Sequence, residues 1–208
     1  MNIAIDGPAA SGKSSLGRAL AREFGLRFVE TGRMYRAVAW AEARGIPLER
    51  IEMKVTLAGR FLVNGDDVTD LLHTPEMDQA SSRVATRPEV RARLVELQRA
   101  IARSSDVVME GRDIGTVVLP DAEVKLFLLA STRERARRRI AQRADGDLEA
   151  MIMELEIRDE RDSSRAIAPL KPARDATIID TDQKTLTEVI SEASNVVKER
   201  LGRRCHGG

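Results

Sequence analysis

Residues 1–14 read MNIAIDGPAASGKS, and this stretch decides the fold. A short apolar run is followed by glycine, lysine and serine at the spacing G-x-x-x-x-G-K-[ST], which is the signature of a phosphate-binding loop. Glycine at positions 7 and 12 allows the positive φ and the close approach with which backbone N–H groups surround a polyphosphate. The stretch therefore predicts a strand, then the loop, then a helix that begins at Lys13.

Lys13 and Ser14 supply the chemistry that such a loop needs. Lys13 would reach the β and γ phosphates as a point charge, and the Ser14 hydroxyl would ligate Mg²⁺. The helix N-terminus adds its positive dipole to the same anion. A glycine-rich turn with a solvated lysine is the alternative, but the apolar spacing of residues 14–24 favours a helix there. We predict ATP binding at Gly7, Pro8, Ala9, Ala10, Ser11, Gly12, Lys13, Ser14 and Ser15.

Length and composition narrow the class of protein. A chain of 208 residues with 42% hydrophobic residues can bury one core, with room for a small insert. Because 34 basic residues nearly balance 33 acidic ones, no global field favours nucleic acid or a membrane. Cys205 is the single cysteine, which excludes an internal disulfide, and His73 and His206 are too far apart to suggest a metal pair. Asp6 and the lack of a long apolar stretch argue against a signal peptide, so we predict a cytoplasmic protein.

Strand-like and helical patterns alternate along the chain, which predicts an α/β fold with a parallel sheet covered by helices. Two of the strand patterns are apolar without alternation, as expected for strands buried on both faces, and we predict that these two, 106–110 and 124–130, are central. The predicted strands are 2–6, 27–30, 106–110, 124–130 and 176–180.

Residues 37–103 depart from this alternation and are predicted to form an insert. An Asn64-Gly65 pair between apolar runs predicts a hairpin over residues 61–68. The insert could carry specificity for a second substrate, and a simple connecting bundle is the alternative. The predicted helices around the hairpin are 35–44, 48–57, 75–85 and 88–103.

Two further helical patterns, 131–143 and 147–165, meet at the Asp145-Gly146-Asp147 turn, and Pro169 and Pro172 follow the second. A final amphipathic helix is predicted over residues 183–201. Two helices that are joined by a glycine-containing turn are what a closing lid requires.

Arg158, Arg161 and Arg165 have the spacing i, i+3, i+7, which predicts one stripe of guanidinium groups on a helix. Like charges on such a stripe repel one another, although Glu154 and Asp162 offer partial relief. An ordinary salt-bridged surface is the alternative, but a bound phosphate explains the stripe better because arginine recognises phosphate oxygens in a planar, bidentate way.

Residues 110–113 read EGRD and follow directly on a predicted central strand, so they lie at the carboxyl edge of the sheet, where open α/β folds bind ligands. Glu110 could orient Mg²⁺ through its waters, Arg112 could clamp a phosphate, and Asp113 could accept a hydrogen bond from an amino group. A salt-bridged loop is the alternative. The stretch ETGRMYR at residues 30–36 offers a weaker anion site near the loop.

Six arginines lie within residues 133–143, so a nucleic-acid groove has to be considered. Aromatic residues make up only 3% of the chain, which leaves little for base stacking. We predict a mostly solvated helix face, with one or two arginines near the adenine or phosphates of ATP. A GTPase would carry an Asn-Lys-x-Asp motif and a D-x-x-G switch, and neither is found, whereas a small kinase needs the second anion site and the lid.

Five stretches together resemble the bacterial cytidylate kinase family over essentially the full length of the chain. The resemblance implies a P-loop NTPase-type sheet of five parallel strands with a nucleoside-monophosphate-binding insert and a short helical lid. It divides the chain into a core of 1–36 and 104–208, an insert of 37–103 and a lid at about 144–168. The stretches are GPAASGKSS at 7–15, ETGRMYR at 30–36, ASSRVATRPEVR at 80–91, EGRDIGTVV at 110–118 and RDERDSSRAIAPL at 158–170.

The resemblance also implies which residues bind the acceptor, CMP. Ser82, Arg91 and Asp113 resemble the cytosine-reading set, and Asp162 resembles the residue that holds the ribose hydroxyls. Thr31 stands where the family often has serine, and Glu110 where it often has aspartate, so both positions keep their functional group. The remaining implied CMP-binding residues, most of them phosphate-clamping, are Thr31, Tyr35, Arg36, Arg112, Arg158 and Arg165.

The implied activity is ATP-dependent phosphorylation of CMP and dCMP with Mg²⁺, by a monomer that binds neither nucleic acid nor a membrane. Lys13, Arg112, Arg158 and Arg161 would be the catalytic groups, and Ser14 and Glu110, the latter through water, would hold the metal. A kinase for UMP, AMP or shikimate is the nearest alternative. A nucleotide sensor or a nucleic-acid-dependent ATPase is an alternative of a different class.

Overall fold

The computed structural model describes residues 1–143 and 146–205. Two residues named above, Asp145 of the predicted turn and His206, lie outside the described part. So does the side chain of Cys205. Within it, no helix is long and apolar enough to cross a membrane.

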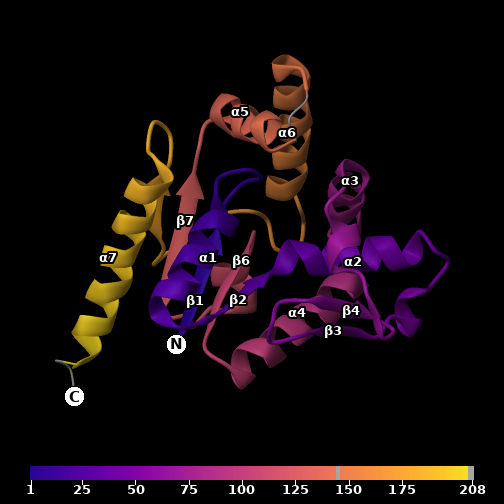
Figure 1. The fold of residues 1–208 in the computed structure, drawn as a ribbon, viewed down its shortest axis with the longest axis horizontal. Helices are drawn as coiled ribbons and strands as arrows, with labels where there is room; N and C mark the ends of the chain where they lie inside the picture. Colours follow the sequence, from indigo (N-terminus) through magenta and orange to yellow (C-terminus); the bar gives the residue numbers. More distant parts are fainter. Residues whose placement is uncertain (144–145, 206–208) are drawn as a thin grey trace.

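A five-stranded parallel sheet forms the centre of the protein (Figure 1), as predicted. Its strand order is β2-β6-β1-β7-β8, and each neighbouring pair is parallel. The two strands predicted to be central, β6 and β7, flank β1, and the predicted boundaries hold to within one residue. The strands are β1 (Asn2–Asp6), β2 (Arg27–Glu30), β6 (Val107–Gly111), β7 (Val124–Leu129) and β8 (Thr177–Asp180).

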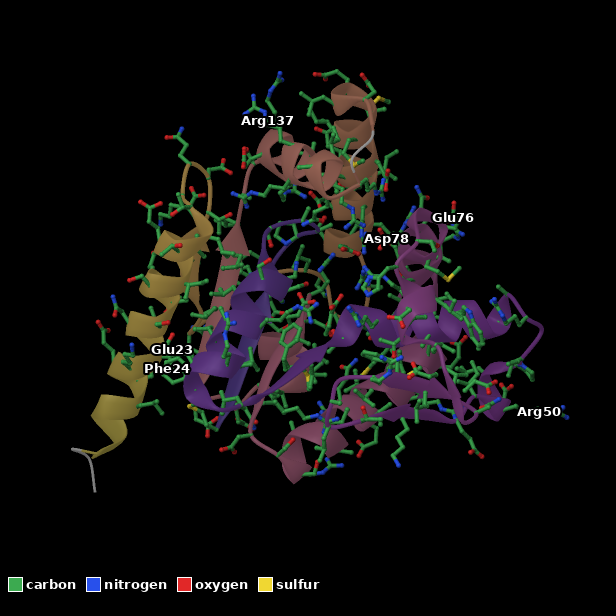
Figure 2. All side chains as sticks on the ribbon, in the orientation of Figure 1. Glu23, Phe24, Arg50, Glu76, Asp78 and Arg137 are labelled. Carbon is green, nitrogen blue, oxygen red and sulfur yellow. The ribbon has the colours of Figure 1, made fainter. Side chains whose placement is uncertain are left out.

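Helices cover both faces of this sheet because side chains alternate along each strand. Ile3 and Ile5 of β1 pack with α1 (Lys13–Phe24) and α7 (Leu186–Cys205) on one face. Ala4 of β1 belongs to the core on the other face, which the insert covers. Figure 2 shows Glu23 and Phe24 at the end of α1 that faces α7, where Glu23 accepts a 2.6 Å hydrogen bond from Ser194.

The insert contains both predicted and unpredicted elements. The hairpin at Asn64-Gly65 is confirmed, since β4 pairs antiparallel with β5. The helix predicted over 48–57 is wrong, because the chain forms a short 3₁₀ turn, Leu48–Arg50, and then strand β3, which pairs antiparallel with β4. Apolar residues 51, 53 and 55 alternate with polar ones, which is a strand period, and β3 uses it to join the hairpin. The regular elements of the insert region are α2 (Thr31–Glu42), β3 (Met53–Val55), β4 (Phe61–Val63), β5 (Asp66–Asp67), a 3₁₀ turn (Thr69–Leu72), α3 (Pro75–Val84) and α4 (Pro88–Ser104).

The two predicted lid helices are α5 (Thr132–Arg143) and α6 (Leu148–Ser163). They pack on each other and on the phosphate-binding loop through a small apolar cluster of Ala9, Ala136, Met151 and Leu155. Figure 1 shows this pair beyond the end of the sheet, with α3 of the insert facing α6. Helix α6 was predicted to end at Arg165, but it ends two residues earlier, at Ser163. The division into core, insert and lid stays a prediction.

Candidate active site

A cavity of about 370 Å³ opens where β1, β2 and β6 end, at the carboxyl edge of the sheet. This is the edge at which open α/β sheets bind ligands. Segments far apart in the sequence line the cavity together: the loop after β1, the start of α2, the helices α3 and α4, the turn after β6, and α6. The predicted site residues that line it are Ala9, Ala10, Gly12, Lys13, Ser14, Ser15, Thr31, Tyr35, Arg36, Ser82, Arg91, Glu110, Arg112, Asp113, Arg158, Asp162 and Arg165.

The loop after β1 has the backbone geometry that its glycines predict. Gly7 and Gly12 have φ angles of 147° and 94°, and a Cβ atom on Gly7 would meet the carbonyl oxygen of Leu128 at 2.5 Å. Gly7, Pro8 and Ser11 do not line the cavity, but they shape the loop around it. Helix α1 begins at Lys13, as predicted, so its N-terminus faces the cavity.

Lys13 is folded back into this loop. Its Nζ atom donates to the Pro8 carbonyl oxygen at 2.6 Å and lies 3.5 Å from Ser11 Oγ. Burial, followed by the neighbouring Arg112, lowers the pKa of Lys13 to about 7. A buried ammonium group that borders a cavity is stabilised by any anion that enters, because the anion favours its charged form.

Ser14 and Glu110 lie together beside Lys13. Ser14 Oγ donates to Glu110 Oε1 at 3.1 Å, and the Glu110 backbone oxygen accepts a 2.8 Å hydrogen bond from Thr31. Burial raises the pKa of Glu110. A hydroxyl and a carboxylate are hard oxygen ligands, which fits Mg²⁺. The described residues contain no group of three or more His, Cys, Asp or Glu that could hold a metal, and Mg²⁺ does not need one, because it keeps several waters and binds substrate phosphates.

A second cluster surrounds Asp113, which follows β6. Arg91 of α4 donates to the Asp113 carboxylate, and the Arg91 guanidinium lies 6.0 Å from the centre of the Tyr35 ring. Burial raises the pKa of Asp113, and burial raises the pKa of Tyr35 to about 12. Ser82 of α3 lines the same cavity. The structure therefore brings together the three residues predicted to read a base, from three separate elements.

Asp6, the last residue of β1, supports this second cluster although sequence reasoning assigned it no role in the site. Its two carboxylate oxygens accept hydrogen bonds from the backbone N–H groups of Ile114 and Gly115, at 2.8 and 2.7 Å. Asp113 directly precedes these two residues, and Gly7 directly follows Asp6. One buried carboxylate thus ties the phosphate-binding loop to the turn that carries Asp113. An acidic residue that directly follows the apolar run of residues 3–5 is the signal that could have found it.

Burial raises the pKa of Asp6 from 3.8 to about 6, which predicts a pH-dependent stability. The folded protein binds this proton more tightly than the unfolded chain does, so the stability that it contributes is present below pH 3.8 and is lost as the pH rises through 6. Asp6→Asn cannot titrate. As the pH rises from acidic to neutral, we expect wild type to lose about 3 kcal/mol of unfolding free energy that the variant does not lose.

Urea denaturation of both proteins across this pH range measures the difference. Asp121→Asn, at an exposed position, is the control and should follow wild type at every pH. A difference between wild type and Asp6→Asn that does not change with pH would contradict the assignment.

The structure keeps part of the predicted arginine stripe. Arg158 and Arg165 line the main cavity, whereas Arg161 donates to Ser82 Oγ at 3.0 Å. Arg158 and Arg161 border a second cavity of about 80 Å³ together, so these two share one side of α6, as their spacing predicts. Arg165 lies beyond the end of α6, so the predicted stripe of three on one helix is wrong at this residue.

Asp162 organises the arginines that do face the main cavity. It is 1% exposed and accepts hydrogen bonds from Arg112, whose Nε atom lies 2.8 Å away, and from Arg165. Burial alone would raise the pKa of Asp162, but these two arginines hold it below its usual value. Burial, followed by Arg112, lowers the pKa of Arg158 to about 9, and the buried Arg158 Nε atom has no hydrogen-bond partner among the residues that the structure describes. An anion in the cavity would offer Arg158 that partner.

The arginines of residues 133–143 are less solvated than predicted. Only Arg133 and Arg137 have side chains more than half exposed. Arg135 is buried and donates to the Ala9 carbonyl oxygen at 3.2 Å, which joins α5 to the phosphate-binding loop. Arg139 lines the main cavity. The prediction of a mostly solvated face fails because α6 and α3 pack on this side of α5.

Charge is unevenly distributed around the main cavity. Among the residues that the structure describes, one lysine and seven arginines line it against four carboxylates. Buried positive charge in excess of its counterions stabilises a polyanion that binds there. Sequence reasoning missed Arg18, because nothing in its local pattern separates it from a surface arginine. It placed one or two unspecified arginines of residues 133–143 near ATP, and Arg139 is the one of them that lines this cavity.

Comparison with known proteins relates this site to a family. The family model described as cytidylate kinase matches residues 3–199. The chain is 46% identical to a cytidylate kinase of Pelotomaculum thermopropionicum, with 98% of this chain and 97% of that protein covered. It is 44% identical to a cytidylate kinase of Geobacillus sp. strain WCH70, with 97% and 98% covered. The fold is shared with a shikimate kinase from Bacteroides thetaiotaomicron, at a TM-score of 0.52, 16% identity, and 97% and 98% coverage.

Proposed function

The chain belongs to the cytidylate kinase family, and we propose that it transfers the γ-phosphoryl group of ATP to CMP and dCMP inside the 370 Å³ cavity. One observation carries the proposal. The cavity joins a phosphate-binding loop to a buried carboxylate, guanidinium and hydroxyl that match the edge of a cytosine. The other acceptors considered from the sequence, UMP, AMP and shikimate, do not require a phosphate-binding loop and a cytosine-reading set in one site.

The donor, ATP, binds at residues 7–15. Backbone N–H groups of the loop and the N-terminus of α1 hold its phosphates. Lys13 leaves the Pro8 carbonyl oxygen, on which it rests at 2.6 Å, for the β and γ phosphates. Because these phosphates favour the charged ammonium group, their binding restores the proton that burial makes Lys13 lose easily.

The acceptor's base is read by Asp113, Ser82 and Arg91. Cytosine presents an N4 amino donor beside acceptors at N3 and O2, so a carboxylate and a hydroxyl accept from N4 while a guanidinium donates to the ring. Uracil places an acceptor against the Asp113 carboxylate and an N3–H donor against Arg91. A site built to hydrogen-bond one pattern rejects the other strongly, since its buried polar groups are then left unpaired.

The sugar and the single phosphate of the acceptor lie between the donor loop and the base-reading residues. Asp162 accepts from the ribose hydroxyls, and a second hydroxyl is not needed for dCMP to bind. Thr31, Tyr35 and Arg36 lie at the start of α2 and contact the acceptor phosphate or base. Arg112, Arg158 and Arg165 clamp the phosphates with planar guanidinium groups.

Mg²⁺ fits the oxygen donors at Ser14 and Glu110. The Ser14 hydroxyl would bind it directly, and the Glu110 carboxylate would hold it through water. When bound, the ion neutralises charge on the donor phosphates. Ser14 Oγ donates to Glu110 Oε1 at 3.1 Å, and this hydrogen bond holds the two side chains beside each other.

The reaction itself needs positioning more than acid–base chemistry. An oxygen of the acceptor's α-phosphate attacks the γ-phosphorus in line, and this oxygen is already ionised near neutral pH. Lys13, Arg112 and Arg158 stabilise the charge that develops on the transferred group. Arg161 joins them if movement of α6 frees it from Ser82, a movement that would also exclude water. The monomeric state, the cytoplasmic location and the lack of nucleic-acid binding stay predictions.

A panel of acceptors tests the proposal. ADP release is measured by a coupled assay with CMP, dCMP, UMP, AMP and shikimate at matched concentrations. We expect kcat/KM for CMP and dCMP to exceed that for UMP by at least about 100-fold. A preference for another acceptor, or ATP turnover that depends on DNA or RNA, would overturn it.

A further inference from the structure

Asp78, a buried carboxylate on α3, holds three arginines that the proposed reaction does not account for together. Asp78 is 5% exposed. Arg36 of α2 donates from Nη2 to Asp78 Oδ1 at 2.8 Å. Arg143 of α5 donates to Oδ2 at 3.4 Å, and Arg139 of the same helix forms a closer ion pair with that oxygen. Figure 2 shows Asp78 on the side of α3 that faces α6, and Glu76 on the outer side.

Two of these arginines border the main cavity. Arg36 and Arg139 both line it, whereas Asp78 and Arg143 do not. Arg36 also lies 3.3 Å from Glu30 Oε1, so its guanidinium is shared between two carboxylates at the cavity wall. Groups that a phosphate in the cavity would use are therefore already engaged by carboxylate oxygens of the protein.

Three arginines share the Asp78 carboxylate, and two of them have a second acidic partner. Arg36 also contacts Glu30, and Arg143 also lies 3.5 Å from Glu154. Even beside these carboxylates, burial, followed by Arg143 and Arg36, lowers the pKa of Arg139. Partly buried cations that repel one another are stabilised by a further anion. A carboxylate offers a planar guanidinium the same kind of oxygen acceptors that a phosphate offers. Asp78 therefore binds these arginines as a substrate phosphate would, from outside the cavity.

We propose that Asp78 is a positioning residue that acts as an internal competitor of substrate phosphate for Arg36 and Arg139. In the nucleotide-free enzyme it holds these arginines at the cavity and joins α3 of the insert to α5. When phosphate enters, the two guanidinium groups exchange Asp78 for it, and Arg143 is then the one of the three arginines that still joins α5 to Asp78. This inference takes the identity of the nucleotide from the proposed function. The contacts of Asp78 with the arginines do not depend on it.

The isosteric variant Asp78→Asn tests the competition. It keeps the shape and removes the charge, so the arginines are left for the incoming anion. With inorganic pyrophosphate as the probe, we expect calorimetry to give a dissociation constant at least about fivefold lower than wild type. Thermal unfolding without ligand should occur at a lower temperature, and the rise in that temperature on adding pyrophosphate should be larger.

Glu76→Gln is the matched control, because it removes one negative charge from the same turn of α3 at an exposed position. Its pyrophosphate affinity should stay within about twofold of wild type. An Asp78→Asn affinity equal to or weaker than that of Glu76→Gln would overturn the proposal. A purely structural role for Asp78 predicts that weaker affinity, since a loosened site binds less well.

A second variant, which is expected to weaken pyrophosphate binding, tests the proposal if Asp78→Asn fails to fold. Arg143→Gln removes the arginine that shares Asp78 without reaching the cavity, so Asp78 should hold Arg36 and Arg139 more strongly. We expect pyrophosphate to bind at least about threefold more weakly than to Arg137→Gln, an exposed arginine of the same helix that controls for net charge. Equal affinities of the two variants would contradict the competition.

The outcome can be separated from that of the proposed function. Pyrophosphate has no base, so its binding does not depend on which nucleoside monophosphate the enzyme accepts. A failed acceptor panel with a tighter Asp78→Asn complex would reject CMP as the substrate and keep the competition. A preference for CMP in the acceptor panel, without tighter pyrophosphate binding in Asp78→Asn, would support the kinase activity and reject the role of Asp78. With CMP as the varied substrate, the competition further predicts a lower KM in Asp78→Asn than in Glu76→Gln.

Discussion

Lys13→Met should lower kcat by at least about 1,000-fold while the protein stays folded. Among the described residues, Lys13 is the one ammonium group that lines the cavity, and it is the first residue of α1. A cation that is pre-positioned at the transferred phosphoryl group contributes more in the transition state than in the ground state, and removal of such a group typically costs 10²-fold or more. The coupled ADP-release assay with saturating ATP and CMP measures the loss.

Stability separates loss of chemistry from loss of fold. Burial lowers the pKa of Lys13 to about 7, which means that the charged side chain is costly in the empty site. A methionine of similar length removes that cost, so the thermal unfolding temperature of the ligand-free variant should equal or exceed that of wild type. Stabilisation by ATP should be smaller than in wild type.

Lys54→Met controls for the substitution itself, because Lys54 is an exposed residue of β3. It should keep wild-type kcat. Near-normal turnover in Lys13→Met would contradict the role of the loop, whereas a lower unfolding temperature would mean that the lysine is structural.

The loop and the sheet could be predicted because their signals are local. The spacing of Gly7, Gly12 and Lys13 can be read without any distant partner, and so can the apolar strands beside it. The positions of these elements then follow from the parallel order of the sheet. This is why most predicted site residues, which directly follow strands or begin helices, meet in one cavity.

The failures concern residues whose environment is set by distant elements. Residues 51–55 carry only a short strand period, and pairing with β4 is what makes residues 53–55 a strand. Arg161 donates to Ser82, which is 79 residues away in the chain, and borders the smaller cavity. Asp6 and Asp78 carry little local signal, because the groups that they hold come from other elements. Tertiary contacts of this kind cannot be read from periodicity.

Asp113→Asn should lower kcat/KM for CMP by about 100-fold or more and narrow the selectivity between CMP and UMP. Asp113 is 5% exposed and pairs with Arg91, so a base that binds there meets a fixed charge in a water-poor site. The asparagine keeps one oxygen acceptor, but it loses the charge-assisted hydrogen bond to N4, which typically contributes about 1.5–3 kcal/mol. Its amide group can instead donate to O4 of uracil.

Asparagine is the better substitution than alanine because it fills the same space. Alanine would leave a cavity and an unpaired buried guanidinium on Arg91, and the resulting destabilisation would be confused with loss of binding. Kinetics should be measured with CMP and UMP as acceptors and, separately, with ATP as the varied substrate. We expect KM for ATP to change by less than about threefold, since the ion pair of the Asp113 side chain is with Arg91 of α4 and not with a residue of the donor loop.

Ser82→Ala is the companion variant, because Ser82 offers N4 a neutral partner where Asp113 offers a charged one. A neutral hydrogen bond typically contributes about 1 kcal/mol, so we expect a loss of about fivefold for CMP. The order of the two variants is the decisive result, since it reports which group reads the base through charge. Equal losses in kcat/KM for CMP and ATP in Asp113→Asn would mean that Asp113 holds the site together through Asp6 and the turn after β6. In that case the carboxylate would not read the base, and selectivity for cytosine would have to come from Arg91 and Ser82.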